Sequence, residues 1–518
     1  MRLMARLVGS SPTGAARSRG RSFAAARRFG ALLPVLAFSL LIAAPGQASR
    51  PRAALGSSSV GDMRFHARVT PFRHGERETR AEFSIRIPYR QIKFLARDSL
   101  LQADVRLTVE LKSSSGKVVA REQQTAQVQV MDPVVATDSL LGEIYTVGLA
   151  APPGEYKFKV LVEDMNVARR GLVYVMKNQK RQGEVTGTVD LGRWLFAKPA
   201  LSGILPAWTI GPRTEESRFG KGPYEVLPQP SGFYGLYQDV FSAYYEIYDA
   251  PPPPEGRNYR LTSRIVGATG DTIFTSHDSL RVTEGTAWPH ALSVDLTTIA
   301  AGHYSFLLSI ESSEEGTRPS STVTEFDLLW NAESWGPFAS DGFEVAAKVL
   351  LSAEDALDFG ELALGAKEAR MQELWRSVDP TPETADNETY AEFLRRVEHA
   401  NISYTIFEPG MFSDRGRIYI RFGEPDEIRI ERLPVNDKTL GYAISGEIPL
   451  QSEQQLLKQN SGIVDTRPYE IWTYELRGKE LAPRRGLSET SHALKFVFVD
   501  EQGYGDYLLR YSSTSGVH

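Results

Sequence analysis

The chain has 518 residues, of which 42% are hydrophobic and 24% are charged, and it contains no cysteine. This length exceeds what one compact core supports, so we expect about three domains. The lack of cysteine excludes disulfides and thiol catalysis, and the formal net charge is −5.

Residues 1–48 have the composition of a secretory signal peptide. Seven arginines and no acidic residue lie in this segment, which continues into an apolar run at 30–44 and small residues before a cleavage site predicted after Ala48. The alternative, an uncleaved membrane anchor, requires about 20 apolar residues, and this run is shorter. Removal of the segment leaves 52 basic and 64 acidic residues, a net charge of −12, which argues against nucleic acid, whose phosphates require a basic protein surface. We therefore predict a protein exported through the inner membrane, periplasmic or extracellular, with no transmembrane span.

Strand patterns follow a flexible segment predicted at 49–61. Phe83, Ile85 and Ile87 alternate with polar neighbours, which is the period of a half-buried strand. Residues 104–123 have the order strand, Ser/Gly turn, strand, which predicts a hairpin.

A sequence repeat indicates that this unit occurs twice. RLTVELKSSSGKVVA at 106–120 aligns with RLTSRIVGATGDTIF at 260–274, and APPGEYKFKVLVE at 151–163 aligns with IAAGHYSFLLSIE at 299–311. Two ungapped matches in the same order predict two copies of one β-domain.

We predict that each copy is an all-β immunoglobulin-like sandwich, at residues 62–197 and 198–332, because a strand-rich unit of this size with regular turns favours that architecture. The segment 198–235 is rich in Pro and Gly. It is expected to connect the sandwiches and to supply the first strands of the second one.

Residues 231–249 are unusually aromatic. The rings belong to Phe233, Tyr234, Tyr237, Phe241, Tyr244, Tyr245 and Tyr248. An exposed row of such rings would suit sugar or peptide binding. We favour the alternative, in which alternate rings fill the sandwich core and flank the domain junction, because aromatic residues favour strands and dominate core burial.

The pattern changes after Trp330. Apolar residues recur at helical spacing within 343–351, 371–378 and 390–404, and strand patterns return at 418–422, 469–476, 494–500 and 507–511. Helices followed by strands predict an α+β domain at 333–518, after the two sandwiches.

One joint pattern of residues extends across 370–475 of this last domain. It consists of Trp375, Asp379, Pro380, Pro382, Asn387, Glu388, Arg396, Asn401, Gly410, Met411, Ser413, Asp414, Arg415, Gly416, Tyr419, Gly423, Pro425, Asp426, Trp472 and Tyr474. With these residues the segment resembles the GWxTD-domain family of exported bacterial proteins, named after a Gly-Trp-x-Thr-Asp motif. Here that motif contains Met411 in place of Trp and Ser413 in place of Thr, so an apolar side chain and a hydroxyl are kept. The resemblance implies no defined activity.

Most of the polar residues in the pattern have a structural interpretation. Asp379-Pro380 is expected to end a helix, Asp386 or Asn387 to cap the next one, and Glu388 to lie in its first turn. The alternative is a cation site built from the four acidic residues between 379 and 388, but their spacing differs from an EF-hand loop. We predict no metal and no cofactor.

Turns are predicted on both sides of the Asp414 segment. Ser413 is expected to form a side-chain-capped turn, and Gly423-Glu424-Pro425-Asp426 a turn set by Gly and Pro.

Asp414 and Arg415 are the residues with the clearest chemical potential. We expect them on a strand, with side chains on opposite faces, and Arg415 bound to Glu388 or Asp379. The favoured interpretation is a buried Arg–carboxylate network that holds helix to strand. In the alternative, one carboxylate stays free as a general acid or base, and Asp414, Arg415 and Glu388 form the centre of a hydrolase.

The sequence therefore predicts an exported, non-catalytic envelope protein. It would present binding surfaces to a protein or polysaccharide of the envelope, and not to nucleic acid. The alternative is a hydrolase that acts on an envelope polymer.

Overall fold

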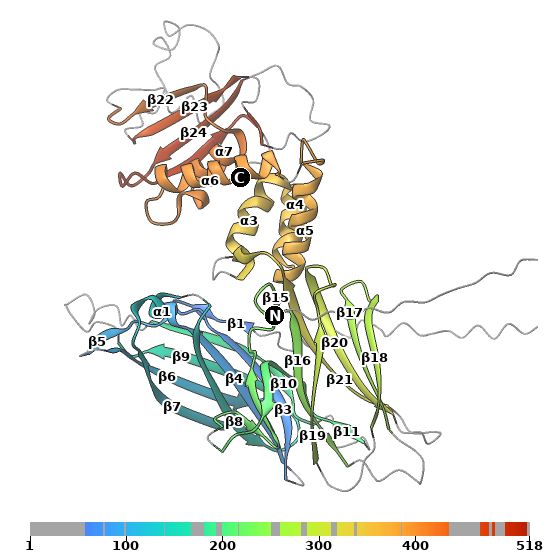
Figure 1. Ribbon diagram of the computed structural model, residues 1–518. Helices are drawn as coiled ribbons and strands as arrows, with labels where there is room; N and C mark the ends of the chain where they lie inside the picture. The colour runs from blue at the N-terminus through green and yellow to red at the C-terminus, as the bar shows by residue number, and fades with distance from the viewer. Residues whose placement is uncertain are drawn as a thin grey trace, which may run out of the picture. The chain divides into compact units, whose positions relative to one another are not determined.

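The computed structural model describes residues 57–514, apart from 76–77, 98–99, 139, 167–180, 193–198, 216, 250–258, 281–286, 312–318, 336–338, 385, 435–466, 476–478 and 482–492. The described residues form five β-sheets, with the longer helices following the first four of them (Figure 1). This confirms a multidomain, β-rich protein. The predicted signal peptide lies outside the described residues.

Two sheets at the start of the described chain share one core. The four-stranded sheet has the order β1 (Ser57–Ser58), β3 (His66–His74), β4 (Glu78–Pro88) and β8 (Gly142–Ala151). The six-stranded sheet has the order β2 (Val60–Gly61), β10 (Gln182–Asp190), β9 (Glu155–Asp164), β6 (Leu100–Lys112) and β5 (Leu95–Arg97), with β7 (Val118–Val130) also paired with β6. The short helices η1 (Tyr89–Gln91) and α1 (Pro133–Thr137) lie in the connections.

Successive side chains of a strand point to opposite faces of its sheet, so every second side chain of these strands lies in this first core. Phe83, Ile85 and Ile87 of β4 are fully buried, and Val105 and Val109 of β6 pack in the same cluster. The predicted strand and the predicted hairpin, which is β6–β7, are therefore confirmed.

A second pair of sheets follows. The six-stranded sheet has the order β11 (Ala200–Leu201), β16 (Val240–Tyr248), β12 (Leu205–Pro212), β14 (Tyr224–Pro228) and β13 (Gly220–Lys221), with β19 (Ala287–Asp295) also paired with β16. The five-stranded sheet has the order β15 (Phe233–Gly235), β21 (Ser320–Leu329), β20 (Gly302–Glu311), β17 (Tyr259–Gly267) and β18 (Thr272–Leu280). Strand β15 runs parallel to β21. The strands at 200–235 confirm that this segment opens the second pair.

The aromatic residues at 231–249 lie mainly in the interior, as the favoured interpretation predicted, but more of them are buried than the alternate ones expected, because Tyr244 and Tyr245 are both buried. Those buried are Tyr234, Phe241, Tyr244, Tyr245 and Tyr248. Phe233 is half-buried, and Tyr237 is 50% exposed. The segment therefore contributes mainly to packing.

The two sequence repeats have the same local structure. Gly116 and Gly270, which the alignment pairs, both lie in hairpin turns with positive φ (84° and 92°), a conformation that glycine adopts without steric cost. The hydroxyl of Tyr156 donates to the carbonyl of Pro152 (2.8 Å), and that of Tyr304 donates to the carbonyl of Ala300 (2.9 Å). Equivalent positions therefore make equivalent hydrogen bonds.

The remainder of the chain combines helices with a fifth sheet. The helices are η3 (Ala332–Trp335), α3 (Ala339–Leu350), α4 (Ala353–Gly360), α5 (Leu364–Ser377), α6 (Glu388–Ser403), η4 (Gly410–Phe412) and α7 (Asp414–Phe422). The antiparallel sheet has the order β22 (Glu427–Glu431), β23 (Tyr469–Tyr474), β24 (Leu494–Asp500) and β25 (Tyr507–Ser512). No helix among the described residues is long and apolar enough to cross a membrane.

The predicted strand at 418–422 is wrong, because these residues form the end of helix α7, and Asp414 and Arg415, also expected on a strand, lie in its first turn. Ile418 and Phe422 pack with the fifth sheet, whereas Ile420 packs in the helical cluster that contains Phe393 and Ala400. A helix buried on two sides shows apolar residues at alternate positions, and this pattern imitates a strand.

Helix α5 packs on the second pair of sheets. Its Glu368 is buried and accepts hydrogen bonds from the backbone N–H groups of Trp330 (2.8 Å) and Asn331 (3.2 Å). The backbone N–H of Gly365 donates to Asp327 of β21 (3.1 Å), which is also bonded to the His303 imidazole (3.0 Å). These contacts hold the start of α5 against β20 and β21.

The His303–Asp327 pair predicts a pH dependence. Burial lowers the pKa of His303, but the hydrogen bond and the charge of Asp327 outweigh it and raise the pKa above its usual 6.5. The stabilisation by His303 should therefore be complete at acidic pH and lost as the pH rises through the folded-state pKa. We expect His303→Gln to lower the free energy of unfolding more at about pH 5.5 than at about pH 8.5, measured by urea unfolding. An equal loss at both values would contradict this.

Candidate functional site

The first part of the family-like segment is the link between α5 and α6. Asn387 caps α6 by accepting a hydrogen bond from the Tyr390 N–H (2.9 Å), and its amide donates to the carbonyl of Trp375 in the last turn of α5 (2.7 Å). Trp375 packs its ring 5.0 Å from those of Tyr390 and Phe393. The predicted cap and the helix end before Asp379 are confirmed. One asparagine thus satisfies backbone groups of two helices.

Two glycines of the segment allow three backbone layers to approach closely. A Cβ on Gly410 would overlap the carbonyl oxygen of Ala400 in α6, and a Cβ on Gly416 in α7 would overlap the carbonyl oxygen of Gly410. Asn401 holds the middle layer, because its side chain accepts a hydrogen bond from the Met411 N–H (2.9 Å). Only residues without a side chain permit this stacking of α6, η4 and α7.

Both ends of the short helix α7 are capped by side chains from the pattern. At its start, Ser413 Oγ accepts from the Gly416 N–H (3.1 Å) and donates to the Gly410 carbonyl (2.7 Å). At its end, the buried Arg396 donates to the carbonyls of Ile420 (3.1 Å) and Arg421 (3.2 Å). A helix of nine residues leaves nearly half of its backbone groups without an intrahelical partner, so these caps stabilise it directly.

The Ser413 cap gives a testable prediction. Ser413→Ala removes one acceptor and one donor, and we expect it to lower the free energy of unfolding by about 1–2 kcal/mol. Ser413→Thr keeps the hydroxyl and should change stability by less than about 0.5 kcal/mol. Chemical denaturation of the two variants tests this. Equal losses in both would mean that the hydroxyl does not stabilise the protein.

Arg415 is the centre of a buried polar cluster, although with a different partner from the one predicted. Its Nη1 lies 3.1 Å from Glu470 Oε1 on β23, and its Nη2 donates to the carbonyl of Gly505 (3.1 Å). The guanidinium also lies 5.1 Å from the centre of the Tyr404 ring and 4.4 Å from that of Tyr507. The Arg415 and Glu470 side chains are only 11% and 10% exposed. A buried Arg–carboxylate contact joins helix to strand, as predicted, but neither Glu388 nor Asp379 takes part.

Glu470 is itself fully occupied. Its second carboxylate oxygen accepts a hydrogen bond from the indole of Trp472 (3.0 Å), two positions along β23. Trp472 is buried and packs 4.9 Å from the ring of Phe498. Each carboxylate oxygen of Glu470 thus has a partner, as a buried charge requires.

The other two residues of the predicted hydrolase centre make separate contacts. Asp414 lies in the first turn of α7, where it pairs with Arg417 and accepts from the Leu509 N–H (2.7 Å). The exposed Glu388 is bonded to the Thr381 hydroxyl (2.6 Å), which lowers the pKa of this carboxyl. Asp414 and Arg415 therefore contact different residues in and beside β25, whereas Glu388 is bonded within the link between α5 and α6.

The last residues of the pattern close the connection from α7 to the sheet. Gly423 has a φ of 81° and ends the helix, and its carbonyl accepts a hydrogen bond from the Tyr474 hydroxyl (3.0 Å). After Pro425, the Asp426 carboxylate accepts from the Glu475 N–H (2.6 Å). The predicted turn is confirmed. Within the described part of the chain, no three His, Asp or Glu side chains are grouped to hold a metal ion.

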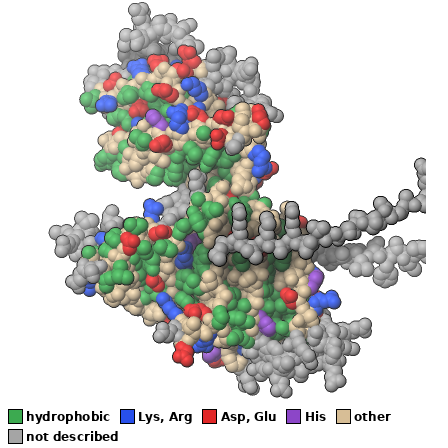
Figure 2. Space-filling model, in the orientation of Figure 1, with side chains coloured by type: hydrophobic (Ala, Val, Ile, Leu, Met, Phe, Trp, Pro, Cys, Tyr) green, Lys and Arg blue, Asp and Glu red, His purple; other side chains and the backbone are tan. Residues whose placement is uncertain are grey.

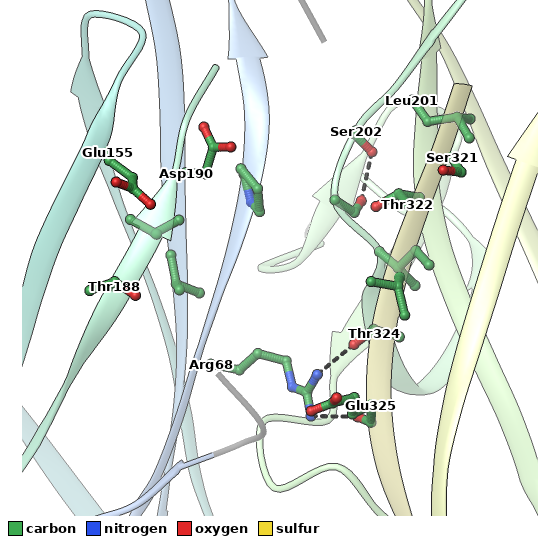
Figure 3. A pocket seen from close by; sticks show the side chains of 16 residues that line it. Arg68, Glu155, Thr188, Asp190, Leu201, Ser202, Ser321, Thr322, Thr324 and Glu325 are labelled. Carbon is green, nitrogen blue, oxygen red and sulfur yellow. Dashed lines mark hydrogen bonds between the residues drawn. The ribbon is translucent and has the colours of Figure 1, made fainter. Parts of the chain in front are cut away.

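A cavity of about 200 Å³ lies elsewhere, between the first and second pairs of sheets (Figure 3). Arg68 and Pro71 of β3 contribute to it, with Glu155 and Asp190 from the ends of β9 and β10. The opposite wall is formed by residues 201–204 and by 321–325 of β21.

Arg68 crosses from β3 toward β21 at one end of this cavity (Figure 3). It is only 3% exposed, and it donates to the Thr324 hydroxyl (2.6 Å) and to the Glu325 carbonyl (3.2 Å). Its Nε has no hydrogen-bond partner among the described residues, and the carboxylates of Glu325 and Asp327 act on its charge electrostatically. Burial lowers the pKa of Arg68, opposed by Tyr234, Glu325 and Asp327.

Sequence reasoning missed this cavity, because its walls come from segments far apart in the chain. Arg68 is one polar residue of an alternating strand, and no local pattern distinguishes it. The only related signal was the repeat, which predicted two β-domains and therefore a junction between them.

Comparison with known proteins identifies the family-like segment. A family model of the GWxTD domain matches residues 358–436. No curated protein sequence matches the chain. Among solved structures, a Bacteroides uniformis β-glucuronidase 2 is 10% identical and a Parabacteroides merdae β-glucuronidase 9% identical, each with a TM-score of 0.17. Each match covers 49% of this chain and 26% or 28% of the enzyme. The chain thus spans about a quarter of those structures, and TM-scores of this size support no argument.

Proposed function

We propose, from the GWxTD domain at residues 358–436, that this is an exported, non-catalytic binding protein of the bacterial cell envelope. In this proposal the GWxTD domain is mainly architectural. The β-sheet pairs would present the surface that contacts an envelope protein or polysaccharide, in the periplasm or outside the cell.

The observation that supports a non-catalytic role is the closed set of contacts in the GWxTD segment. Arg415 is bound by Glu470, Asp414 by Arg417 and a backbone N–H, and Arg396 by backbone carbonyls. A general acid or base needs a carboxyl that is free to reach a substrate. Among these residues, the polar atoms instead satisfy helix ends and one another.

We also propose that both pairs of sheets are immunoglobulin-like sandwiches, at 62–197 and 198–332. The hydrogen bonds of Tyr156 and Tyr304 to carbonyls four residues earlier support this. Such a tyrosine, bonded a few residues upstream at a corner between strands, recurs in immunoglobulin-type domains. These domains commonly serve as recognition modules on cell surfaces.

The surface shown in Figure 2 is compatible with a partner that is uncharged or that carries charges of both signs. On the face shown in Figure 2, basic and acidic side chains are interspersed over the described residues, with hydrophobic side chains between them. This distribution favours neither a polyanion nor a polycation.

The test is to incubate the chain from residue 49 onward with purified envelope polysaccharides. Co-sedimentation would measure binding, and release of reducing ends would measure hydrolysis. We expect binding without release. Release that is abolished by Asp414→Asn or Glu388→Gln would favour the hydrolase alternative. Absence of binding to both polysaccharides and envelope proteins would refute the proposal.

A further inference from the structure

We infer that the cavity between the two pairs of sheets binds one uncharged, hydroxyl-rich ring, that is, a single sugar unit. This inference rests on the proposed binding function and gives it a site and a ligand class. The cavity volume of about 200 Å³ is below the roughly 300–1,000 Å³ of pockets for drug-sized ligands. It therefore suits a ligand of one ring.

The charges that line the cavity exclude an anion. The carboxylates of Glu155, Asp190 and Glu325 outnumber the single cation, Arg68. An acidic ligand would meet this excess of negative charge in a partly desolvated site, which weakens its binding. A metal ion is not supported either, because the described carboxylates form no metal-binding group.

Several polar side chains of the cavity are accessible to a ligand. Glu155, Thr188 and Ser321 are exposed, and Thr322 and Glu325 are half-buried. The charge of Glu325 also acts on the nearby Arg68. Carboxylates accept hydrogen bonds from hydroxyl groups, and Ser or Thr hydroxyls both donate and accept. A sugar ring supplies such groups around its whole edge.

Arg68 adds a buried donor to this arrangement. Its Nε is inaccessible and makes no hydrogen bond to a described residue, so donation to a ligand would come from the second N–H of Nη1 or Nη2, which already donate to Thr324 and Glu325. An ether or hydroxyl oxygen beside the guanidinium would accept a hydrogen bond without adding charge.

The remaining wall is apolar. Pro71 of β3 lines the cavity, as do Leu201, Ile204 and Val323 on the side of β11 and β21. A sugar ring has C–H faces as well as a polar edge, so a cavity of mixed lining matches both of its surfaces.

The experiment uses the whole chain from residue 49 and matched pairs of ligands. Saturation-transfer NMR and competition titrations would compare glucose with glucuronate and galactose with galacturonate. We expect a neutral hexose to bind at least about tenfold more tightly than its uronate, because only the uronate carries a charge into an acidic site. Thr322→Val, which removes one hydroxyl at nearly constant shape, should weaken hexose binding about fivefold to tenfold.

Glu325→Gln removes one negative charge from the site at nearly constant shape. It should reduce the preference for hexose over uronate by about tenfold, whereas the matched control Glu122→Gln, at an exposed position of β7, should leave the preference unchanged. The inference is overturned if no hexose binds, if the uronates bind equally well, or if Thr322→Val and Glu325→Gln behave like the control. A chain that still binds envelope polysaccharide in co-sedimentation would then keep the proposed function and lose this site.

Discussion

Arg415→Ala is expected to lower the free energy of unfolding by about 3–5 kcal/mol, because it leaves Glu470 as a buried charge without its counterion. The pair is nearly inaccessible to water, and Glu470 would keep only the hydrogen bond from the Trp472 indole. The substitution also removes the guanidinium from between the Tyr404 and Tyr507 rings. Calorimetry should show the loss in the transition of the C-terminal domain.

Two further variants separate a charge effect from a general packing effect. Arg415→Met combined with Glu470→Gln removes both charges and should restore much of the stability, because replacing a buried ion pair by apolar or neutral groups is often close to neutral. Arg417→Ala breaks the more exposed pair with Asp414 and should cost at most about 1 kcal/mol. If Arg415→Ala were no more harmful than Arg417→Ala, the architectural role of the motif would be refuted, and Arg415 would again be a candidate for catalysis.

The features that could be predicted from the sequence are those decided by neighbouring residues. The alternation around Ile85 is a property of a few consecutive positions, and so is the cap at Asn387. The repeat can also be recognised in the sequence, because Tyr156 and Tyr304 lie at matching places in two copies of one pattern. In each case the physical cause acts within about ten residues.

The sequence-based predictions are wrong where contacts between segments far apart in the chain determine the structure. The sequence of helix α7 has the apolar alternation of a strand, because Ile420 packs against α6 while Tyr419 and Ile418 pack with the fifth sheet. The sequence predicts Glu388 or Asp379 as the partner of Arg415. The true partner, Glu470, lies 55 residues after Arg415, on a strand whose position depends on the whole domain. The junction cavity depends on Arg68 and Thr324, which are 256 residues apart.

Gly416→Ala is expected to be as harmful as the loss of Arg415, although it adds only one methyl group. A Cβ at this position would overlap the carbonyl oxygen of Gly410 and also approach Ser413 Oγ. Backbone atoms cannot rotate away as a side chain can, so η4 and α7 would have to separate. This separation would disturb the Ser413 cap and the packing of Ile420 in the helical cluster. We expect a loss of about 3 kcal/mol or more.

Gly360→Ala is the matched control, because Gly360 also lies in a helix and a Cβ there would meet no atom within 4 Å. This change should leave stability unchanged or raise it by up to about 1 kcal/mol, since alanine favours helices. Urea unfolding of both variants, beside the parent chain, gives the comparison. A Gly416→Ala protein as stable as Gly360→Ala would show that α6, η4 and α7 do not need their close approach. The glycines of the motif would then require a functional explanation, such as access of a partner to the backbone of this loop.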